Sequence, residues 1–176
     1  MWMQMAENFA YRKSDAVISM LPNTLEHMKA HGMKEEKWHY VPNGFVKDDW
    51  KSPMALNQKT FQQISKIKKS FNYTIAYTGT LGLANALDTF VDAAAKIERQ
   101  DIAFVMVGTG PEKVRLNKRI LEQGLKNVFI LDSVGKKEVP SLLHEFDLLF
   151  IGLQYQRLFR FGISPNKLID YMMAAK

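Results

Sequence analysis

From Tyr73 onward, short apolar runs alternate with longer stretches that have helical periodicity. The runs that predict strands are Tyr73–Thr78, Ala103–Val107, Asn127–Leu131 and Asp147–Ile151. Each run is separated from the next by enough chain for a helix to cross over, which is the rhythm of a parallel sheet. This alternation restricts the main part of the chain to an α/β fold, a Rossmann-like parallel sheet flanked by helices.

The three crossovers carry helical signals of their own. In the first, one apolar stripe contains Leu87, Phe90, Val91, Ala94 and Ile97. Pro111 is predicted to be the first residue of the second helix and Gly124 to end it. A third helix is predicted over about residues 137–145.

Before Tyr73 the pattern differs. It predicts a strand at Asp15–Met20, a helix after Pro22 and a second strand at Trp38–Val41. Polar residues then predict a linker, and Lys59–Phe71 a connecting helix. We therefore expect three parts: an initial segment over residues 1–45, a linker with its helix over 46–71, and the main domain over 72–176.

Composition excludes several classes of protein. The 176 residues include no cysteine, which excludes disulfides and thiolate chemistry. Apolar runs such as Leu148–Leu153 are too short to cross a bilayer, so we expect a soluble, cytoplasmic protein. We expect no metal site and no cofactor, because the histidines do not follow a metal-ligand pattern; they are His27, His31, His39 and His144.

The net charge of +6 favours an anionic partner but does not identify one. Lysines on presumed helix faces, such as Lys66, Lys68 and Lys69, supply much of the excess. One interpretation is therefore a non-catalytic module whose basic surface binds anionic membrane or nucleic acid. The aromatic residues lie mostly at core-like positions rather than among the basic ones, which argues against nucleic acid.

Glycines follow the predicted strands at the edge of the sheet where doubly wound folds bind ligands. Gly79 and Gly82 follow the first strand, and Gly108 and Gly110 the second. A glycine lets the backbone approach a phosphate closely, but it also serves ordinary turn geometry. Neither loop has the third glycine of a dinucleotide site, and no lysine of the P-loop kind follows.

The segment Phe161–Tyr171 predicts a helix that could bind an anion. Ser164 suits the N-cap and Pro165 the first turn, and a buried stripe is expected from Leu168, Ile169, Met172 and Met173. The amides near Asn166 and the ammonium of Lys167 could neutralise a diphosphate, with Asp170 one turn further on for a ribose. Alternatively, Ser164 and Pro165 only start the helix, Lys167 is solvated, and Asp170 pairs with Lys167 or with water.

Five segments in order resemble the large family of bacterial retaining glycosyltransferases with the GT-B fold, which has two Rossmann-like domains and a cleft between them. The segments are Tyr11–Ser19, Val41–Gly44, Tyr77–Leu81, Val107–Pro111 and Asn127–Leu131 with Val134. The resemblance identifies residues 1–45 as the end of an acceptor domain and 72–176 as a donor-binding domain that stops before its last elements. It therefore implies a fragment that is inactive alone, in which the catalytic residues remain unknown.

The sequence departs from the motifs of this family at two places. The family closes on two glutamates separated by seven residues, of which the second contacts the ribose; here they fall on Gly162 and Asp170. The family's arginine and lysine that clamp the diphosphate fall near Thr80 and Asn85. Lys167 is the evident substitute for that clamp.

By the same resemblance, the chain binds a nucleotide-diphosphate sugar, most readily a UDP-sugar, and the whole enzyme transfers a hexose or N-acetylhexosamine to a polysaccharide or lipid-linked acceptor. Peripheral contact with the inner membrane would follow from such an acceptor. The implied binding residues are Gly79, Thr80, Gly82, Gly108, Gly110, Val134, Ser164, Asn166, Lys167 and Asp170.

Overall fold

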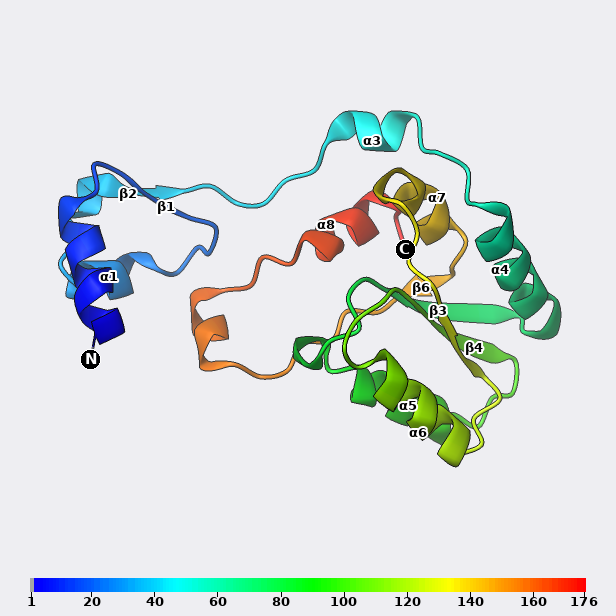
Figure 1. Cartoon of the computed structure of the whole chain (residues 1–176). Coiled ribbons are helices and arrows are strands. Elements are labelled where there is room, and N and C mark those ends of the chain that lie inside the picture. The colour runs from blue at the N-terminus through cyan, green and yellow to red at the C-terminus, as the bar shows by residue number, and fades with distance from the viewer. Residues whose placement is uncertain (1) are drawn as a thin grey trace. The chain divides into compact units, whose positions relative to one another are not determined.

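The structure is a computed structural model that describes residues 2–176, and its contacts divide the chain into two compact units. The first unit contains the residues up to Gly44 together with Tyr155–Asn166. The second contains Phe45–Gln154 and Lys167–Lys176 (Figure 1). We describe each unit by itself.

A four-stranded parallel sheet forms the centre of the second unit. Its strands are β3 (Tyr73–Thr78), β4 (Ile102–Val107), β5 (Val128–Leu131) and β6 (Leu148–Leu149). They lie in the order β5-β4-β3-β6, so the chain crosses over between non-adjacent strands only on its way to β6. The parallel sheet predicted from the alternating pattern is confirmed.

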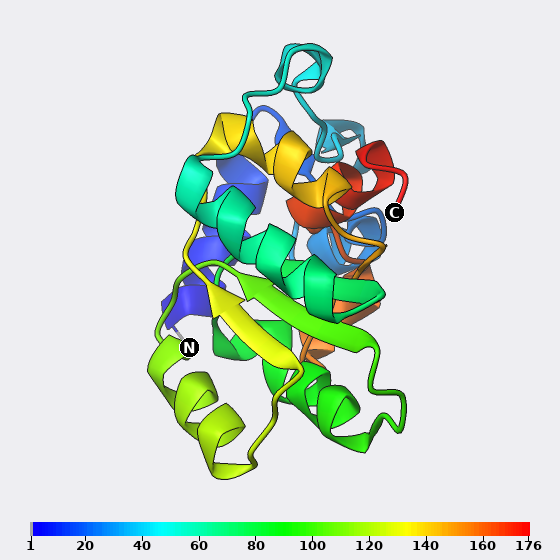
Figure 2. The ribbon, with the colours of Figure 1, turned by 90° about the vertical axis from the view of Figure 1, so that its right-hand side faces the viewer.

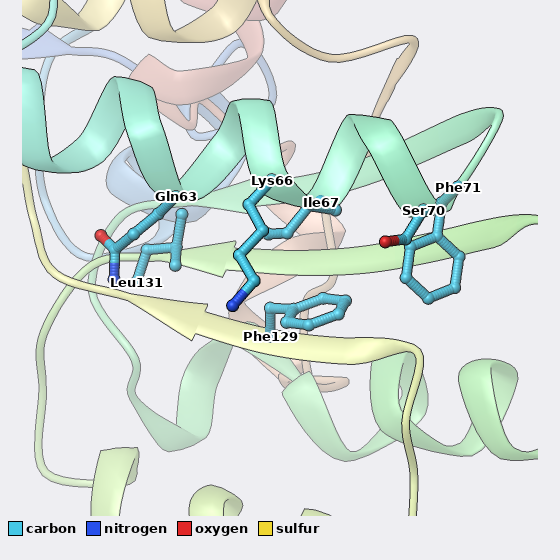
Figure 3. Close-up of a pocket in the computed structure, with 7 residues that line it drawn as sticks. All are labelled: Gln63, Lys66, Ile67, Ser70, Phe71, Phe129 and Leu131. Carbon is cyan, nitrogen blue, oxygen red and sulfur yellow. The ribbon is translucent and has the colours of Figure 1, made fainter.

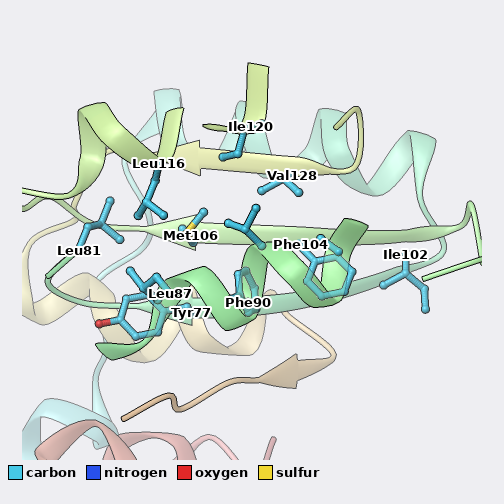
Figure 4. Packing of buried hydrophobic residues seen from close by; sticks show 12 residues of the cluster. Tyr77, Leu81, Leu87, Phe90, Ile102, Phe104, Met106, Leu116, Ile120 and Val128 are labelled. Carbon is cyan, nitrogen blue, oxygen red and sulfur yellow. The ribbon is translucent and has the colours of Figure 1, made fainter. Parts of the chain in front are cut away.

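Helices cover both faces of this sheet. On one face lie α4 (Gln58–Ser70) and α7 (Val139–His144), and on the other lie α5 (Leu87–Lys96) and α6 (Lys113–Glu122) (Figure 2). Strand β4 is buried on both sides, because Phe104 and Met106 pack with α5 and α6 (Figure 4) while Val105 and Val107 face the other way. A strand buried on both faces reads as one continuous apolar run, and β4 does so.

Two short helices complete the second unit. Helix α3 (Lys47–Lys51) precedes α4, and α8 (Asn166–Met173) follows β6 along the chain. Tyr171 of α8 and Ala174, the residue after the helix, pack with Leu143 of α7 and Leu149 of β6. Two 3₁₀ helices, Leu83–Asn85 and Lys136–Glu138, lead into α5 and α7.

The first unit contains a two-stranded parallel sheet. Strand β1 (Val17–Ser19) pairs with β2 (Trp38–Tyr40), and α2 (Leu25–Ala30) connects them. Helix α1 (Trp2–Lys13) precedes β1, and 3₁₀ helices span Glu35–Lys37 and Arg157–Phe161. A hydrogen bond from the Trp38 indole to Thr24, 3.1 Å long, ties the second strand to the turn before α2.

Several sequence predictions are wrong in detail. Helix α6 begins at Lys113, so Pro111 lies in the turn before the helix and not at its first position. The strand predicted at Asp147–Ile151 is reduced to the two residues of β6, and α3 interrupts the predicted linker. The apolar stripe that we expected to be buried on α8 is also wrong, because Leu168, Met172 and Met173 are all exposed.

Candidate site at the carboxyl edge of the sheet

The loops after β3 and β4 are joined by backbone hydrogen bonds. The Gly79 N–H donates to the Val107 carbonyl and the Leu81 N–H to the Thr109 carbonyl, both over 2.9 Å. The two chains approach so closely that a Cβ atom on Gly108 would overlap the Gly79 carbonyl oxygen. The same holds for Gly110 and the Leu81 carbonyl. These two glycines therefore have a packing role that needs no ligand.

Most amide groups of these loops already have acceptors inside the protein. Gly82 donates to the Thr80 carbonyl, and Gly108 to the Leu131 carbonyl. Thr80 is exposed, and within residues 2–176 its N–H has no hydrogen-bond acceptor. An anion at this loop would consequently be met by the Thr80 amide rather than by the N–H groups of Gly79, Gly82 or Gly108.

Lys167, in the first turn of α8, reaches across to the loop after β3. Its ammonium donates to the Tyr77 hydroxyl over 2.7 Å and to the Asn85 side-chain oxygen over 2.9 Å. It also lies 4.3 Å from the centroid of the Tyr77 ring, a cation–π contact. A Cβ atom on Gly79, whose φ is +131°, would lie 3.5 Å from the Lys167 Nζ, so the ammonium is beside the backbone of this loop.

The charge of Lys167 is not compensated by the protein. Within residues 2–176 its ammonium makes no ion pair; both hydrogen-bond acceptors are neutral groups. Burial lowers the pKa of Lys167 to about 8. A half-buried cation without a carboxylate partner is stabilised by an anion from solution. Of the alternatives left open by the sequence, a fully solvated Lys167 is excluded.

Asp170 lies one turn beyond Lys167 on α8 and is half-buried. Together with Asp49, Trp50, Lys136, Val139 and Pro140 it lines a cavity of about 70 Å³. Burial raises the pKa of Asp170; Lys136 opposes that rise and Asp49 adds to it. Lys136 is itself paired with Asp49 over 3.2 Å, and within residues 2–176 the Asp170 carboxylate has no hydrogen-bond donor. The predicted pairing of Asp170 with Lys167 is therefore not present.

Tyr171 fixes α8 to the end of β3. The ladder between β3 and β6 stops at Ala76, because β6 pairs over only two residues. The Thr78 N–H beyond it donates instead to the Tyr171 hydroxyl over 2.9 Å, and the Thr78 hydroxyl lies 3.1 Å from the same oxygen. Tyr171 thus takes the place of a missing strand residue. This explains why Tyr171, and not the predicted stripe, is the buried residue of the helix.

Val134 follows β5 and is half-buried against the core between the sheet and α4. Two residues earlier, the Asp132 carboxylate accepts hydrogen bonds from Lys113 over 2.8 Å and from Lys59 over 2.7 Å. These bonds hold the pKa of Asp132 at about 2. The charges in this loop, unlike those on α8, are satisfied within the protein.

Ser164 and Asn166, the other two predicted site residues, belong to the first unit, and α8 begins at Asn166, one residue later than predicted. The Ser164 carbonyl accepts a hydrogen bond of 2.7 Å from the Asn43 side chain. At Gly162 the φ angle is +102°, and a Cβ atom would lie 2.7 Å from the Pro22 ring. The position where the resemblance expects a carboxylate therefore accommodates only glycine.

The candidate site does not coincide with the apolar groove between α4 and the edge strand β5 (Figure 3). That groove, of about 310 Å³, is lined by Gln63, Lys66, Ile67, Ser70, Phe71, Phe129 and Leu131. None of these residues was predicted to bind a ligand. Within residues 2–176, no helix is both long and apolar enough to span a membrane.

The parallel sheet with helices on both faces matches one half of the GT-B glycosyltransferase fold. The chain aligns with the crystal structure of Anabaena HepE in complex with UDP-glucose at a TM-score of 0.73, with 18% identity, covering 99% of this chain and 46% of that one. It aligns with a Staphylococcus aureus TarM structure that contains UDP at a TM-score of 0.66, with 15% identity, covering 100% of this chain and 31% of that one. At these identities the likeness establishes the fold.

Residues 72–176 match the family model described as glycosyl transferases group 1. The chain belongs to this family, which confirms the resemblance seen in the sequence. One relative, the alpha-D-kanosaminyltransferase of Streptomyces kanamyceticus, is 23% identical over 157 residues, which are 87% of this chain and 40% of the relative. The chain thus spans less than half the length of the proteins that it matches here.

Two residues of the site were not recognised in the sequence as partners of Lys167. Tyr77 and Asn85 are 90 and 82 residues away from it along the chain. One signal was available for Tyr77, a hydroxyl-bearing residue near the end of an otherwise apolar strand, because a buried tyrosine hydroxyl requires a hydrogen-bond partner. The sequence did not indicate which partner.

Proposed function

We propose that the second unit binds the diphosphate of a nucleotide sugar, with the Lys167 ammonium as its principal cation. The observation that supports this most directly is the half-buried ammonium, which lies at the carboxyl end of β3 with only neutral groups around it. In doubly wound sheets, ligands bind at that edge. A diphosphate supplies the negative charge that the site lacks.

The remaining predicted residues of the second unit have roles in this proposal. The exposed Thr80 N–H donates to a phosphate oxygen, and the half-buried Asp170 carboxylate accepts hydrogen bonds from the ribose hydroxyls. Val134 contacts the base. Gly79 and Gly82 keep the loop backbone accessible. Gly108 and Gly110 contribute by packing under that loop.

Uridine diphosphate is the preferred nucleotide in this proposal. HepE and TarM were crystallised with UDP-glucose and with UDP, respectively. The whole protein would transfer a hexose or N-acetylhexosamine, with retention, to a polysaccharide or lipid-linked acceptor in the cytoplasm or at the inner face of the membrane. Residues 1–45 would then be the end of an acceptor domain, 46–71 a linker with a connecting helix, and 72–176 the donor-binding domain.

Titration calorimetry with UDP tests the proposal. We expect Lys167→Ala to weaken UDP binding at least about tenfold, because a charge-assisted hydrogen bond contributes about 1.5–3 kcal/mol. Asp170→Asn should weaken the binding of UDP and of uridine alike, because the ribose is common to both. Thus the two variants distinguish phosphate from ribose recognition.

Lys69→Ala is the matched control, because Lys69 is an exposed lysine on α4 and its loss changes the net charge equally. Its UDP affinity should equal that of the wild type. The proposal fails if the folded wild-type protein binds no common nucleoside diphosphate. It also fails if Lys69→Ala and Lys167→Ala weaken UDP equally, since binding would then depend only on net charge.

A further inference from the structure

The Tyr77 hydroxyl connects the two groups that the proposed function assigns to the diphosphate. It accepts a hydrogen bond from the Lys167 ammonium and donates one to the Thr80 carbonyl, each over 2.7 Å. The direction of both bonds is fixed, because an ammonium only donates and a carbonyl only accepts. A directed chain therefore runs from Lys167 through Tyr77 to the backbone of Thr80.

The apolar core does not require this hydroxyl. The Tyr77 side chain is fully buried in the cluster that contains Leu81, Phe90 and Met106 (Figure 4). A phenylalanine would fill the same volume of that cluster without a polar atom to satisfy. What a phenylalanine could not do is hold the ammonium and the Thr80 carbonyl together.

Asn85 supports the same arrangement from the other side of the loop. Its side-chain oxygen accepts from Lys167, and its side-chain nitrogen donates to the same Thr80 carbonyl over 2.9 Å. The Thr80 carbonyl thus accepts hydrogen bonds from both side chains as well as from the Gly82 N–H, which orients the peptide unit between Thr80 and Leu81. The N–H of the exposed Thr80 is in the preceding peptide unit, which joins this one at the Thr80 Cα.

We propose that Tyr77 is a positioning residue for diphosphate binding: it fixes the Lys167 ammonium and the Thr80 loop relative to each other before the nucleotide arrives. This inference rests on the proposed function. Tyr77 would not contact the phosphates itself; it would act through Lys167 and Thr80. Removing its hydroxyl should therefore reduce the affinity for UDP and leave the affinity for uridine unchanged.

A double-mutant cycle measures this dependence. The four proteins are the wild type, Tyr77→Phe, Lys167→Met and the double variant, each titrated with UDP by calorimetry and with uridine by NMR. We expect Tyr77→Phe to weaken UDP about tenfold in the wild-type background, on the order of a hydrogen bond to a charged group. In the Lys167→Met background the same change should weaken UDP less than about twofold, because the two residues act as one unit.

Tyr73→Phe is the matched control on the same strand. Tyr73 is half-exposed at the opposite end of β3, where the Arg99 guanidinium lies 4.9 Å from its ring centroid. Its variant should bind UDP like the wild type. If Tyr77→Phe does not fold, replacing ring hydrogens of Tyr77 with fluorine weakens the hydroxyl as an acceptor without removing it, and the same selective loss of UDP affinity is expected.

Two results would overturn the positioning role even if Tyr77→Phe weakens UDP binding. One is a Tyr77→Phe effect on UDP that is equally large with and without Lys167. The other is an equal loss of UDP and uridine affinity, which would show a structural role only. If Lys167→Met weakens UDP while Tyr77→Phe does not, the proposed function survives and this inference alone fails. Absence of UDP binding by the wild type would refute both.

Discussion

The two sides of the carboxyl edge of the second unit's sheet differ in how far their polar groups are satisfied. On the β4 and β5 side, the Gly108 N–H donates to the Leu131 carbonyl, the Val107 and Thr109 carbonyls accept from the loop after β3, and Asp132 is held by two lysines. On the β3 and α8 side, Lys167 has only neutral partners and Asp170 has no donor within residues 2–176. The β4 and β5 side therefore needs no ligand to satisfy its charges. The β3 and α8 side lacks the negative charge and the hydrogen-bond donors that a ligand would bring.

This difference changes the meaning of the glycine-rich loops. Their glycines looked like a phosphate cradle, yet at Gly108 and Gly110 the structure requires glycine for the approach of two backbones. The capacity to bind an anion lies instead with a lysine on a helix that comes 88 residues after Gly79.

The largest effect is expected on the stability of the protein, from a change on the β4 and β5 side. Gly108→Ala should destabilise the protein by more than about 2 kcal/mol in urea unfolding, because its Cβ would overlap the Gly79 carbonyl oxygen and the two loops would have to separate. Gly82→Ala is the control, since its Cβ would make only ordinary contacts, with the Thr80 methyl group at 3.7 Å and the Asn85 side-chain nitrogen at 4.0 Å. Equal stability of the two variants would show that the close approach is unimportant.

The second effect is expected on the pH dependence of UDP binding at the β3 and α8 side. The Lys167 pKa of about 8 implies that UDP affinity falls as the pH rises from 7 to 9, by up to about tenfold as the ammonium loses its proton. Burial raises the pKa of Tyr77, so its hydroxyl stays protonated in this range. In Lys167→Met the profile from pH 7 to 9 should be flat, which titration calorimetry at three pH values would show.

A smaller effect is expected on the stability of the protein, from the charge of Lys167. The unfolded chain binds the lysine proton more tightly than the folded one, because burial lowers the folded-state pKa. Stability should therefore rise with pH between about 8 and 10, and Lys167→Met should be more stable than the wild type at pH 7. A lower urea midpoint for Lys167→Met would mean that the neutral partners compensate fully for burial of the charge.

The smallest effect is expected at Asp132. Asp132 and Lys59 are exposed and Lys113 is partly exposed, and ion pairs accessible to solvent contribute little to stability. Asp132→Asn should unfold at the same urea concentration as the wild type, from pH 5 to 8. A clear loss of stability would show that the charges of this loop hold β5 and α4 together.

The sequence predicted most accurately the strands and helix faces that follow from local periodicity. Strand β3 has the predicted bounds, and the buried stripe of α5 contains Leu87, Phe90, Val91 and Ala94 as expected. Helix α1 was not predicted, because none of its residues is buried and its sequence therefore lacks a clear core-facing stripe. The buried face of α8 was misjudged because a hydrogen bond to Tyr171, and not hydrophobicity, decides it.

At the candidate site, the sequence identified Lys167 and Asp170 but not their surroundings. Whether Lys167 is solvated or half-buried depends on where α8 meets β3, and that follows from the two-residue length of β6. The apolar run at Asp147–Ile151 predicted a longer strand.

The span of 90 residues between Tyr77 and Lys167 also has a consequence for folding. The site forms only when the last helix has joined the sheet, so contacts of high sequence separation must close before a nucleotide can bind. A molecule in which α8 has detached would keep its core yet lose its ligand. Hydrogen exchange in α8 should accordingly slow more than exchange in β4 when UDP is added, because binding stabilises that docked state.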